Sequence, residues 1–350
     1  MRNKFLKSPT FSVIGENIHT TRVLMRKGRR VVLDPQGEES IKYRGRDGID
    51  QYMSIPDDFK RTKVYEEGRV KHFMIAVTKG MSDDPLEQKQ GESYIAAEID
   101  RQERLGSHFL DLNIDEISHH IEIQKKALRW LIGFYGSISK LPPSVDSSSS
   151  ELIKVGLEEY ERIGRPQGDP MINSASLERV EVLDLASRHK GHVIVTSAGN
   201  DSMPSDEKGR VENAAKMVDL CRERNISFDR IHVDPLLFPI SVDQTFGNHY
   251  LDAVKLMRKE FGDQIRITGG LSNVSFGLPY RRLINDTFIR LAIDAGVDSG
   301  ILNPVESNWG RVMGLDMESE RVKLAMDMLL GHDEFCMNFI GAFREGRLGG

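Results

Sequence analysis

The sequence predicts an α/β fold, a (β/α)8 barrel with an irregular insertion after its first strand. Three observations support this prediction. Short β-branched segments alternate with longer segments of helical periodicity along most of the 350 residues. Eight strand-like segments can be counted, which is the number that this barrel requires. No Gly-x-Gly-x-x-Gly motif follows the first of them, which disfavours the main alternative, a doubly wound open sheet.

The composition is that of one large globular domain, which we expect to span residues 1–350. Hydrophobic residues make up 39% of the chain and charged residues 29%, and the net charge of −5 offers no basic footprint for nucleic acid. The sequence contains no run of about 18 apolar residues, the length that a membrane-spanning helix needs. The basic start Met1–Lys7 lacks the apolar segment of a secretory signal. Cys221 and Cys336 are far apart, so we expect core thiols and a cytoplasmic protein.

Strand and helix signals follow one another in order. The expected strands are Phe11–Gly15, His108–Glu116, Pro143–Asp146, Pro170–Asn173, His192–Ser197, Arg230–Asp234, Ile265–Thr268 and Ser299–Leu302. The expected helices are Leu86–Leu105, Ile121–Tyr135, one that begins near Glu151, Leu177–His189, Glu207–Arg224, Tyr250–Phe261 and one from Pro279 to Ala295. Gly106 ends the first of these helices, and the serines 147–150 can cap the helix that begins near Glu151.

Residues 20–80 interrupt this alternation. They contain the basic runs Arg26–Arg30 and Lys42–Arg46, several glycines and only weak periodicity, so we expect an irregular insertion. A solvated charged surface is the simpler interpretation of the basic runs. A phosphate, a polyglutamate tail or an acidic partner protein are alternative ligands.

Polar residues stand at or just after the carboxyl ends of the expected strands. They are Asp111, Asn113, Asp146, Asn173, Asp234, Asn273 and Asn303, and Glu16 follows the first strand in the same way. In a barrel such residues share one mouth, where ligands bind. Any one of them alone is better explained as a cap or turn residue. Together, acids and amides without a recurring His or Lys fit a neutral heterocycle rich in hydrogen-bond donors.

Other site classes fit the sequence less well. The histidines are dispersed and none has metal-ligand spacing, so we expect no metal site. Asp111 and Asp146 are conceivable as the two carboxylates of a glycoside hydrolase. The 7% aromatic content, however, offers no evident sugar platform.

The stretch Ile265–Phe276 combines a short strand, a Gly-Gly pair and a polar turn that contains Ser272 and Asn273. An amide next to glycines can approach a planar ring closely and offers both a donor and an acceptor. An ordinary strand-to-helix loop explains the stretch equally well.

The strand ends together resemble those of the pterin-binding barrels: the methyltetrahydrofolate–corrinoid methyltransferases and the folate module of cobalamin-dependent methionine synthase. The similar motifs are Phe11–Glu16, Asp111–Asp115, Val145–Ser147, Met171–Ser174, Val233–Pro235, Gly269–Phe276, Ala295–Asp298 and Gly300–Asn303, and the stretch Ala325–Arg344 is similar to the family's closing helices. The resemblance covers residues 10–18 and about 85–345.

The resemblance implies transfer of a methyl group between N5 of methyltetrahydrofolate and the cobalt of a corrinoid. Asp146, Asn173 and Asp234 match the family's pterin-holding positions, and Asn273 matches the residue that hydrogen-bonds N5. Asp111, Asn113, Ser272, Asn303 and Glu16 are further candidate pterin contacts. The chain has no corrinoid-binding Asp-x-His-x-x-Gly motif, so the cobalamin or other corrinoid is expected on a separate partner protein. A homodimer is common in the family.

The chain also departs from the family. Asn17 and His19 follow Glu16 where many relatives carry an arginine, and compact members lack residues 20–80. Dihydropteroate synthase shares the barrel, but its strand-seven Lys-x-Ser-Arg pattern is replaced here by Leu271–Val274. A non-catalytic folate-binding scaffold is a third interpretation, although a scaffold has no need of Asn273.

Overall fold

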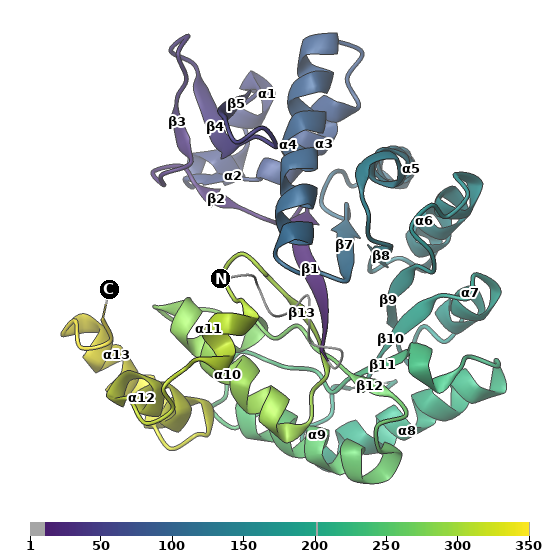
Figure 1. Cartoon of the computed structure of the whole chain (residues 1–350), viewed down its shortest axis with the longest axis vertical. Coiled ribbons are helices and arrows are strands. Elements are labelled where there is room, and N and C mark those ends of the chain that lie inside the picture. The colour runs from purple at the N-terminus through teal and green to yellow at the C-terminus, as the bar shows by residue number, and fades with distance from the viewer. Residues whose placement is uncertain (1–10, 201, 350) are drawn as a thin grey trace. The chain divides into compact units, whose positions relative to one another are not determined.

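The computed structural model describes residues 11–200 and 202–349, so the basic N-terminal stretch of the sequence lies outside the described residues (Figure 1). Its main sheet has eight strands in the order β12-β11-β10-β9-β8-β7-β1-β13. Strand β1 (Ser12–His19) pairs in parallel with β13 (Ser299–Leu302). A parallel bridge joins Gly270, just beyond β12, to Ile301 of β13. The predicted (β/α)8 barrel is therefore confirmed.

The chain divides into two compact units. The C-terminal unit comprises residues 1–15, 105–108 and 171–350, and the N-terminal unit comprises residues 16–104 and 109–170. Each unit is described by itself below.

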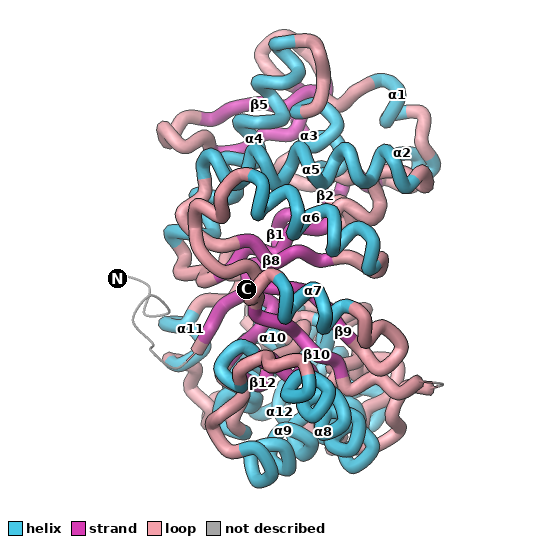
Figure 2. The backbone as a smooth tube through the Cα atoms, turned by 90° about the vertical axis from the view of Figure 1, so that its right-hand side faces the viewer, coloured by secondary structure: helices cyan, strands magenta, loops and turns pink. Residues whose placement is uncertain are grey.

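The C-terminal unit contains most of the barrel strands. Its strands after β1 are β9 (Met171–Ala175), β10 (His192–Thr196), β11 (Ile231–Asp234), β12 (Arg266–Ile267) and β13. Its helices are α7 (Val182–Arg188), α8 (Glu207–Glu223), α9 (Phe246–Phe261), α10 (Arg281–Ala295), α11 (Trp309–Met313), α12 (Glu320–Leu329) and α13 (Met337–Arg344). Short 3-10 helices are η2 (Phe228–Arg230), η3 (Asn273–Ser275) and η4 (Glu334–Cys336). Figure 2 shows strands β9, β10 and β12 in magenta among cyan helices.

Local chemistry accounts for the limits of these elements. The carboxylate of Asp206 accepts the amide of Gly209 at 2.8 Å and so caps the start of α8. Gly296 ends α10 with a φ of +118°, which favours glycine. Cys221 and Cys336 are free and buried, as the sequence predicts.

The N-terminal unit contains the rest of β1 and two further barrel strands, β7 (Phe109–Asn113) and β8 (Pro143–Asp146), which pair in parallel. Helices α4 (Pro85–Arg104), α5 (Ile121–Ile138) and α6 (Ser150–Arg162) accompany them. The hydroxyl of Ser149 accepts the amide of Leu152, so the serine run does cap α6 as expected.

The prediction of an irregular insertion at residues 20–80 is wrong, because this segment is regularly folded. Strands β3 (Val31–Leu33), β4 (Glu39–Arg44) and β5 (Asp50–Ser54) form an antiparallel sheet, and β2 (Leu24–Met25) pairs with β6 (Arg69–Val70). The helices are α1 (Asp57–Lys60), α2 (Lys63–Glu66) and α3 (His72–Gly80). Strands this short show too little periodicity in the sequence to be recognised as strands. Their stability comes from tertiary packing and not from local preference.

Tyrosine rings hold the three-stranded sheet against α4. Tyr43 of β4 meets Tyr94 of α4 edge to face, with ring centroids 4.9 Å apart. The Tyr94 hydroxyl also lies 2.8 Å from His72 Nδ1 on α3. The insertion is thereby anchored to the helix that follows it.

Further predicted bounds need correction. Strand β1 continues through Glu16 to His19 instead of ending at Gly15. Helix α7 begins at Val182, not at Leu177, because the residues before it form turns in which the Arg179 backbone amide donates to the carbonyl of Ser176. The Arg179 guanidinium donates to the carbonyl of Ser174. Within the described residues, no helix combines the length and the apolar character needed to cross a membrane.

Helices α3 and α4 are in close contact at Gly91 of α4, so a larger residue at this position should lower the stability of the protein. A Cβ on Gly91 would lie 2.3 Å from the Ala76 carbonyl and 2.4 Å from the Gly80 amide, both backbone atoms. Gly91→Ala should therefore lower the free energy of unfolding by about 1–3 kcal/mol, measured by chemical denaturation. Gly133→Ala in α5 is the control, since its nearest neighbour would lie at 3.6 Å. Equal stability of the two variants would contradict the packing account.

Candidate functional site

Three titratable side chains meet at the strand ends of the N-terminal unit. His19 ends β1, Asp111 lies in β7 and Asp146 ends β8. His19 Nε2 lies 3.0 Å from Asp111 Oδ2 and 3.9 Å from Asp146 Oδ2. The Ser144 hydroxyl donates to the second oxygen of Asp111. Asp111 is completely buried, and these two contacts satisfy its carboxylate.

Asp146 is the carboxylate of this group that faces solvent, with 22% of its side chain exposed. The amide of Asn113 donates to Asp146 Oδ2 at 2.9 Å. Asn113 Oδ1 in turn accepts the backbone amide of Asp115 at 3.0 Å, which fixes the orientation of the amide. The structure therefore brings together three predicted site residues: Asp111, Asn113 and Asp146.

The proximity of these groups shifts their proton affinities. Burial and the neighbouring charge of Asp111 raise the pKa of Asp146 to about 7, against the opposing effect of His19. Burial alone would lower the pKa of His19. The hydrogen bond and charge of Asp111, with the charges of Asp146 and Glu16, outweigh burial and raise this pKa. The cluster can thus hold or release a proton near neutral pH.

Glu16 lies in the same unit and carries an ion pair. Its carboxylate lies 2.7 Å from Arg22 Nη2, and the same guanidinium donates twice to the Glu16 backbone carbonyl, at 3.1 and 3.2 Å. A fixed fork of this kind holds the chain just after β1 in place.

In the C-terminal unit, Ser272 and Asn273 lie in the turn after β12, where η3 begins. The Asn273 backbone amide donates to the Gly270 carbonyl at 3.0 Å. A Cβ on Gly270 would stand 2.8 Å from Asn273 Nδ2, so the glycine lets the side chain fold back over the turn. Asn273 is exposed, and its amide makes no hydrogen bond within the described residues.

Asp234 ends β11 in the same unit. Its Oδ1 accepts the Leu236 amide at 2.8 Å. Burial raises the pKa of Asp234 to about 6, although this hydrogen bond and the charge of Arg210 oppose the shift. A Cβ on Gly269 would lie 3.3 Å from Asp234 Oδ1, so the glycine pair of the turn also makes room beside this carboxylate.

The remaining predicted site residues are placed as follows. Asn173 lies half-buried inside β9, which continues to Ala175 rather than ending at Asn173. Asn303 follows β13, and its Oδ1 accepts the Val305 amide at 3.0 Å, the arrangement of an Asx turn.

Comparisons with known proteins identify the chain's relatives. The model of the family described as pterin binding enzymes matches residues 84–303. The chain belongs to the pterin-binding enzyme family. It is 27% identical over 268 residues to a methylcorrinoid:tetrahydrofolate methyltransferase of Eubacterium limosum, a match that covers 75% of this chain and 91% of that protein.

A solved structure shows the same fold. A dihydropteroate synthase from Stenotrophomonas maltophilia with imidazole bound in its active site superposes with a TM-score of 0.50 at 13% identity, covering 62% of this chain and 83% of that one. A Xanthomonas albilineans dihydropteroate synthase reaches 0.49 at 16% identity, covering 62% and 81%. The family match includes every predicted site residue except Glu16 and leaves the insertion outside.

Sequence reasoning missed two residues of this pterin-binding chain. His19 is one of several dispersed histidines in the sequence. The signal that distinguishes it is its place at the end of β1, and the sequence predicts that this strand ends earlier, at Gly15. Arg210 is completely buried and donates from Nε to the Pro235 carbonyl at 2.9 Å, which supports the loop after Asp234. No spacing in the sequence distinguishes Arg210 from other helix arginines.

His19, Asp111 and Asp146 also bear on the expectation of no metal site. One potential ligand atom from each lies within 4.8 Å of the others, and an imidazole with two carboxylates is a donor set that divalent transition metals accept. The His19–Asp111 hydrogen bond accounts for the same geometry without an ion. The absence of a metal site stays a prediction.

The raised pKa values predict how stability depends on pH. Folded Asp146 keeps a proton up to about pH 7, whereas an unfolded Asp loses it near pH 3.9. Its contribution to stability is therefore lost as pH rises between these values. His19 acts in the same direction, because the stability from its raised pKa is complete below 6.5 and is lost above it.

Asp146→Asn should remove the first effect. Its stability relative to wild type, measured by urea denaturation, should increase from pH 4 to pH 7 and level off above pH 7. Asp58→Asn serves as the control, since the Asp58 side chain is 95% exposed. If the Asp146 variant and wild type lose stability in parallel across this range, the raised pKa is refuted.

Proposed function

We propose that this protein is a methyltransferase that moves a methyl group between N5 of methyltetrahydrofolate and the cobalt of a corrinoid on a separate protein. The observation that carries the proposal is the relative named methylcorrinoid:tetrahydrofolate methyltransferase, because the match spans 91% of that protein. Membership of the pterin-binding family supports the folate half of the reaction.

Asp146, Asn173 and Asp234 are proposed to hold the pterin ring, with Asp111, Asn113, Ser272, Asn303 and Glu16 as further contacts. The chemistry of the donor set fits such a ring. A carboxylate can accept two hydrogen bonds from a ring N–H and an exocyclic amine, and an amide can meet a neighbouring donor and acceptor. The partial burial of Asp146 keeps competing water away from such bonds.

Asn273 is proposed to act at N5. A tertiary amine is a poor leaving group until its nitrogen is protonated or hydrogen-bonded. The exposed Asn273 amide has no internal partner among the described residues and can donate to N5 as charge develops there. One aligned donor of this kind can contribute about 2.7–4 kcal/mol of transition-state stabilisation.

The corrinoid supplies the metal that accepts or donates the methyl group, so the chain itself need provide no nucleophile. We propose that the corrinoid protein binds as a partner because the sequence carries no corrinoid-binding motif of its own. A cytoplasmic location, which the two separated cysteines favour, and a homodimer, which rests on the family resemblance alone, are part of the same proposal.

The direct test mixes the purified protein with methyltetrahydrofolate and free cob(I)alamin and follows the cobalt absorption spectrum. Conversion to methylcobalamin is expected. The proposal fails if the spectrum is unchanged while the protein condenses p-aminobenzoate with a pterin pyrophosphate, which is the synthase reaction. It also fails if the protein binds folate and catalyses neither reaction, which is the behaviour of a scaffold.

Asn273→Ala should slow methyl transfer by about 100- to 1,000-fold and change the Kd for methyltetrahydrofolate only a few-fold, because the amide acts mainly in the transition state. The rate is measured in single turnovers, and the Kd by calorimetry. Asn338→Ala, at an exposed position of α13, is the matched control. A normal transfer rate in the Asn273 variant would remove this residue from the mechanism.

Gly270→Ala tests the position of the same amide without deleting it. The new methyl group would displace the Asn273 side chain, which can move without disturbing the backbone. We expect a fold and a melting temperature close to wild type and a transfer rate at least tenfold lower. Unchanged transfer would show that the close approach over Gly270 has no role in the reaction.

A further inference from the structure

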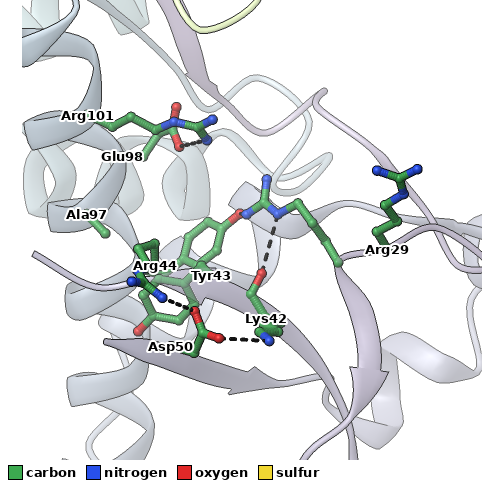
Figure 3. Close-up of a pocket in the computed structure, with 10 residues that line it drawn as sticks. Arg29, Lys42, Tyr43, Arg44, Asp50, Ala97, Glu98 and Arg101 are labelled. Carbon is green, nitrogen blue, oxygen red and sulfur yellow. Dashed lines mark hydrogen bonds and ion pairs between the residues drawn. The ribbon is translucent and has the colours of Figure 1, made fainter. Parts of the chain in front are cut away.

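The insertion and helix α4 line an open cavity of about 440 Å³ within the N-terminal unit, which falls in the size range of small-molecule sites (Figure 3). The methyl transfer proposed above does not use it. Five cationic side chains line this cavity, which we call the basic pocket: Arg29, Arg30, Lys42, Arg44 and Arg101. Its two carboxylates are Asp50 and Glu98.

The cations come from three different elements. Lys42 and Arg44 project from β4, Arg101 lies on α4, and Arg29 and Arg30 lie on the segment that leads into β3. Figure 3 shows Arg44 and Lys42 on either side of Asp50, with Arg29 and Arg101 on other walls. Cations converge on the cavity from several directions, whereas a solvated charged face would spread them apart.

The ion pairs within the basic pocket neutralise only part of its positive charge. Asp50 Oδ2 lies 2.8 Å from Lys42 Nζ and its Oδ1 lies 3.0 Å from Arg44 Nη1, so one carboxylate serves two cations. These two cations hold the pKa of Asp50 below its usual range, and the carboxylate is therefore charged at neutral pH. Glu98 lies 3.8 Å from Arg101, a loose contact, and also accepts the Asn17 amide at 2.9 Å.

Arg29 and Arg30 have no carboxylate partner among the described residues. Arg30 is fixed in place, since it donates to the Tyr94 hydroxyl and to the Lys42 carbonyl. Neither acceptor carries a full negative charge. The lining thus has an excess of three positive charges, in a chain whose net charge is −5. Concentrated charge of this sign raises the local concentration of anions.

We propose that the basic pocket binds a small polyanion that carries several phosphate or carboxylate groups. Planar guanidinium groups match both kinds of oxyanion in a bidentate way. The rings of Tyr43 and Tyr94 and the methyl group of Ala97 supply an apolar wall for the body of such a ligand. Two sources of this chemistry are a polyphosphate ester and a γ-linked polyglutamate chain, and the experiment separates them.

The test is isothermal titration calorimetry on the full chain at 50 mM NaCl. The two probes are inorganic triphosphate and penta-γ-glutamate. At least one probe should bind with a Kd below about 1 mM, and binding should weaken several-fold in 300 mM NaCl because the contacts are charged. The tighter probe identifies the source of the charge. If neither probe binds with a Kd below about 1 mM, the proposal is overturned.

Matched variants separate a built site from general attraction. Arg29→Gln combined with Arg44→Gln should weaken binding at least tenfold, since both residues line the pocket and both are exposed enough to leave the fold intact. Arg61→Gln combined with Arg104→Gln removes the same charge from exposed positions of the same unit outside the pocket, and should change the Kd less than twofold. Equal losses of affinity in the two double variants would contradict the proposal of a specific site.

Asp50→Asn provides a gain-of-affinity test. The substitution releases Lys42 and Arg44 from their shared carboxylate, so the bound polyanion should gain two partners and its Kd should fall about three- to tenfold. An unchanged or larger Kd would show that these two cations do not face the ligand.

Discussion

The contact between His19 and Asp111 is the interaction on which the chemistry of the N-terminal unit depends. Asp111 is completely buried, and an unpaired carboxylate in that position would be strongly destabilising. His19 supplies the partner at 3.0 Å and Ser144 supplies a second donor. Burial and the neighbouring carboxylate of Asp111 together raise the pKa of Asp146 to about 7. The accessible carboxyl of the cluster can therefore donate or accept a hydrogen bond near neutral pH.

The insertion shows how packing turns a weakly patterned segment into an ordered structure. Its strands are short, and a hairpin of this size is marginal alone. Tyr43, Tyr94 and His72 connect the sheet to α4 and α3 through ring contacts and a hydrogen bond. Once the sheet is anchored, the alternation of β4 places Lys42 and Arg44 on one face beside Asp50. The packing that stabilises the insertion therefore also positions the residues of the basic pocket.

The sequence was most informative where a strand or helix carries its own signal. The bounds of β8 were predicted as observed, because Pro143 opens the strand and the serine run closes it. Helix α4 was also predicted within a residue at each end. The sequence predicts too early an end for β1 because Glu16 and Asn17 are polar, although their backbone continues the strand. The predicted strand therefore does not include His19. The insertion was misjudged because cross-strand pairs such as Arg44 with Asp50 join residues that no local period connects.

Two of the residues proposed to contact the pterin are Asp146, which ends β8 in the N-terminal unit, and Asn273, which begins η3 in the C-terminal unit. The central claim is that a methyl group passes between folate N5 and a corrinoid. The most direct measurement follows the carbon itself, with ¹³C-methyl-labelled methyltetrahydrofolate, the protein and cob(I)alamin observed by NMR. The account predicts that the N-methyl signal is replaced by a cobalt-bound methyl signal at a rate that depends on protein concentration. Persistence of the N-methyl signal in the presence of bound folate and reduced cobalamin would contradict it.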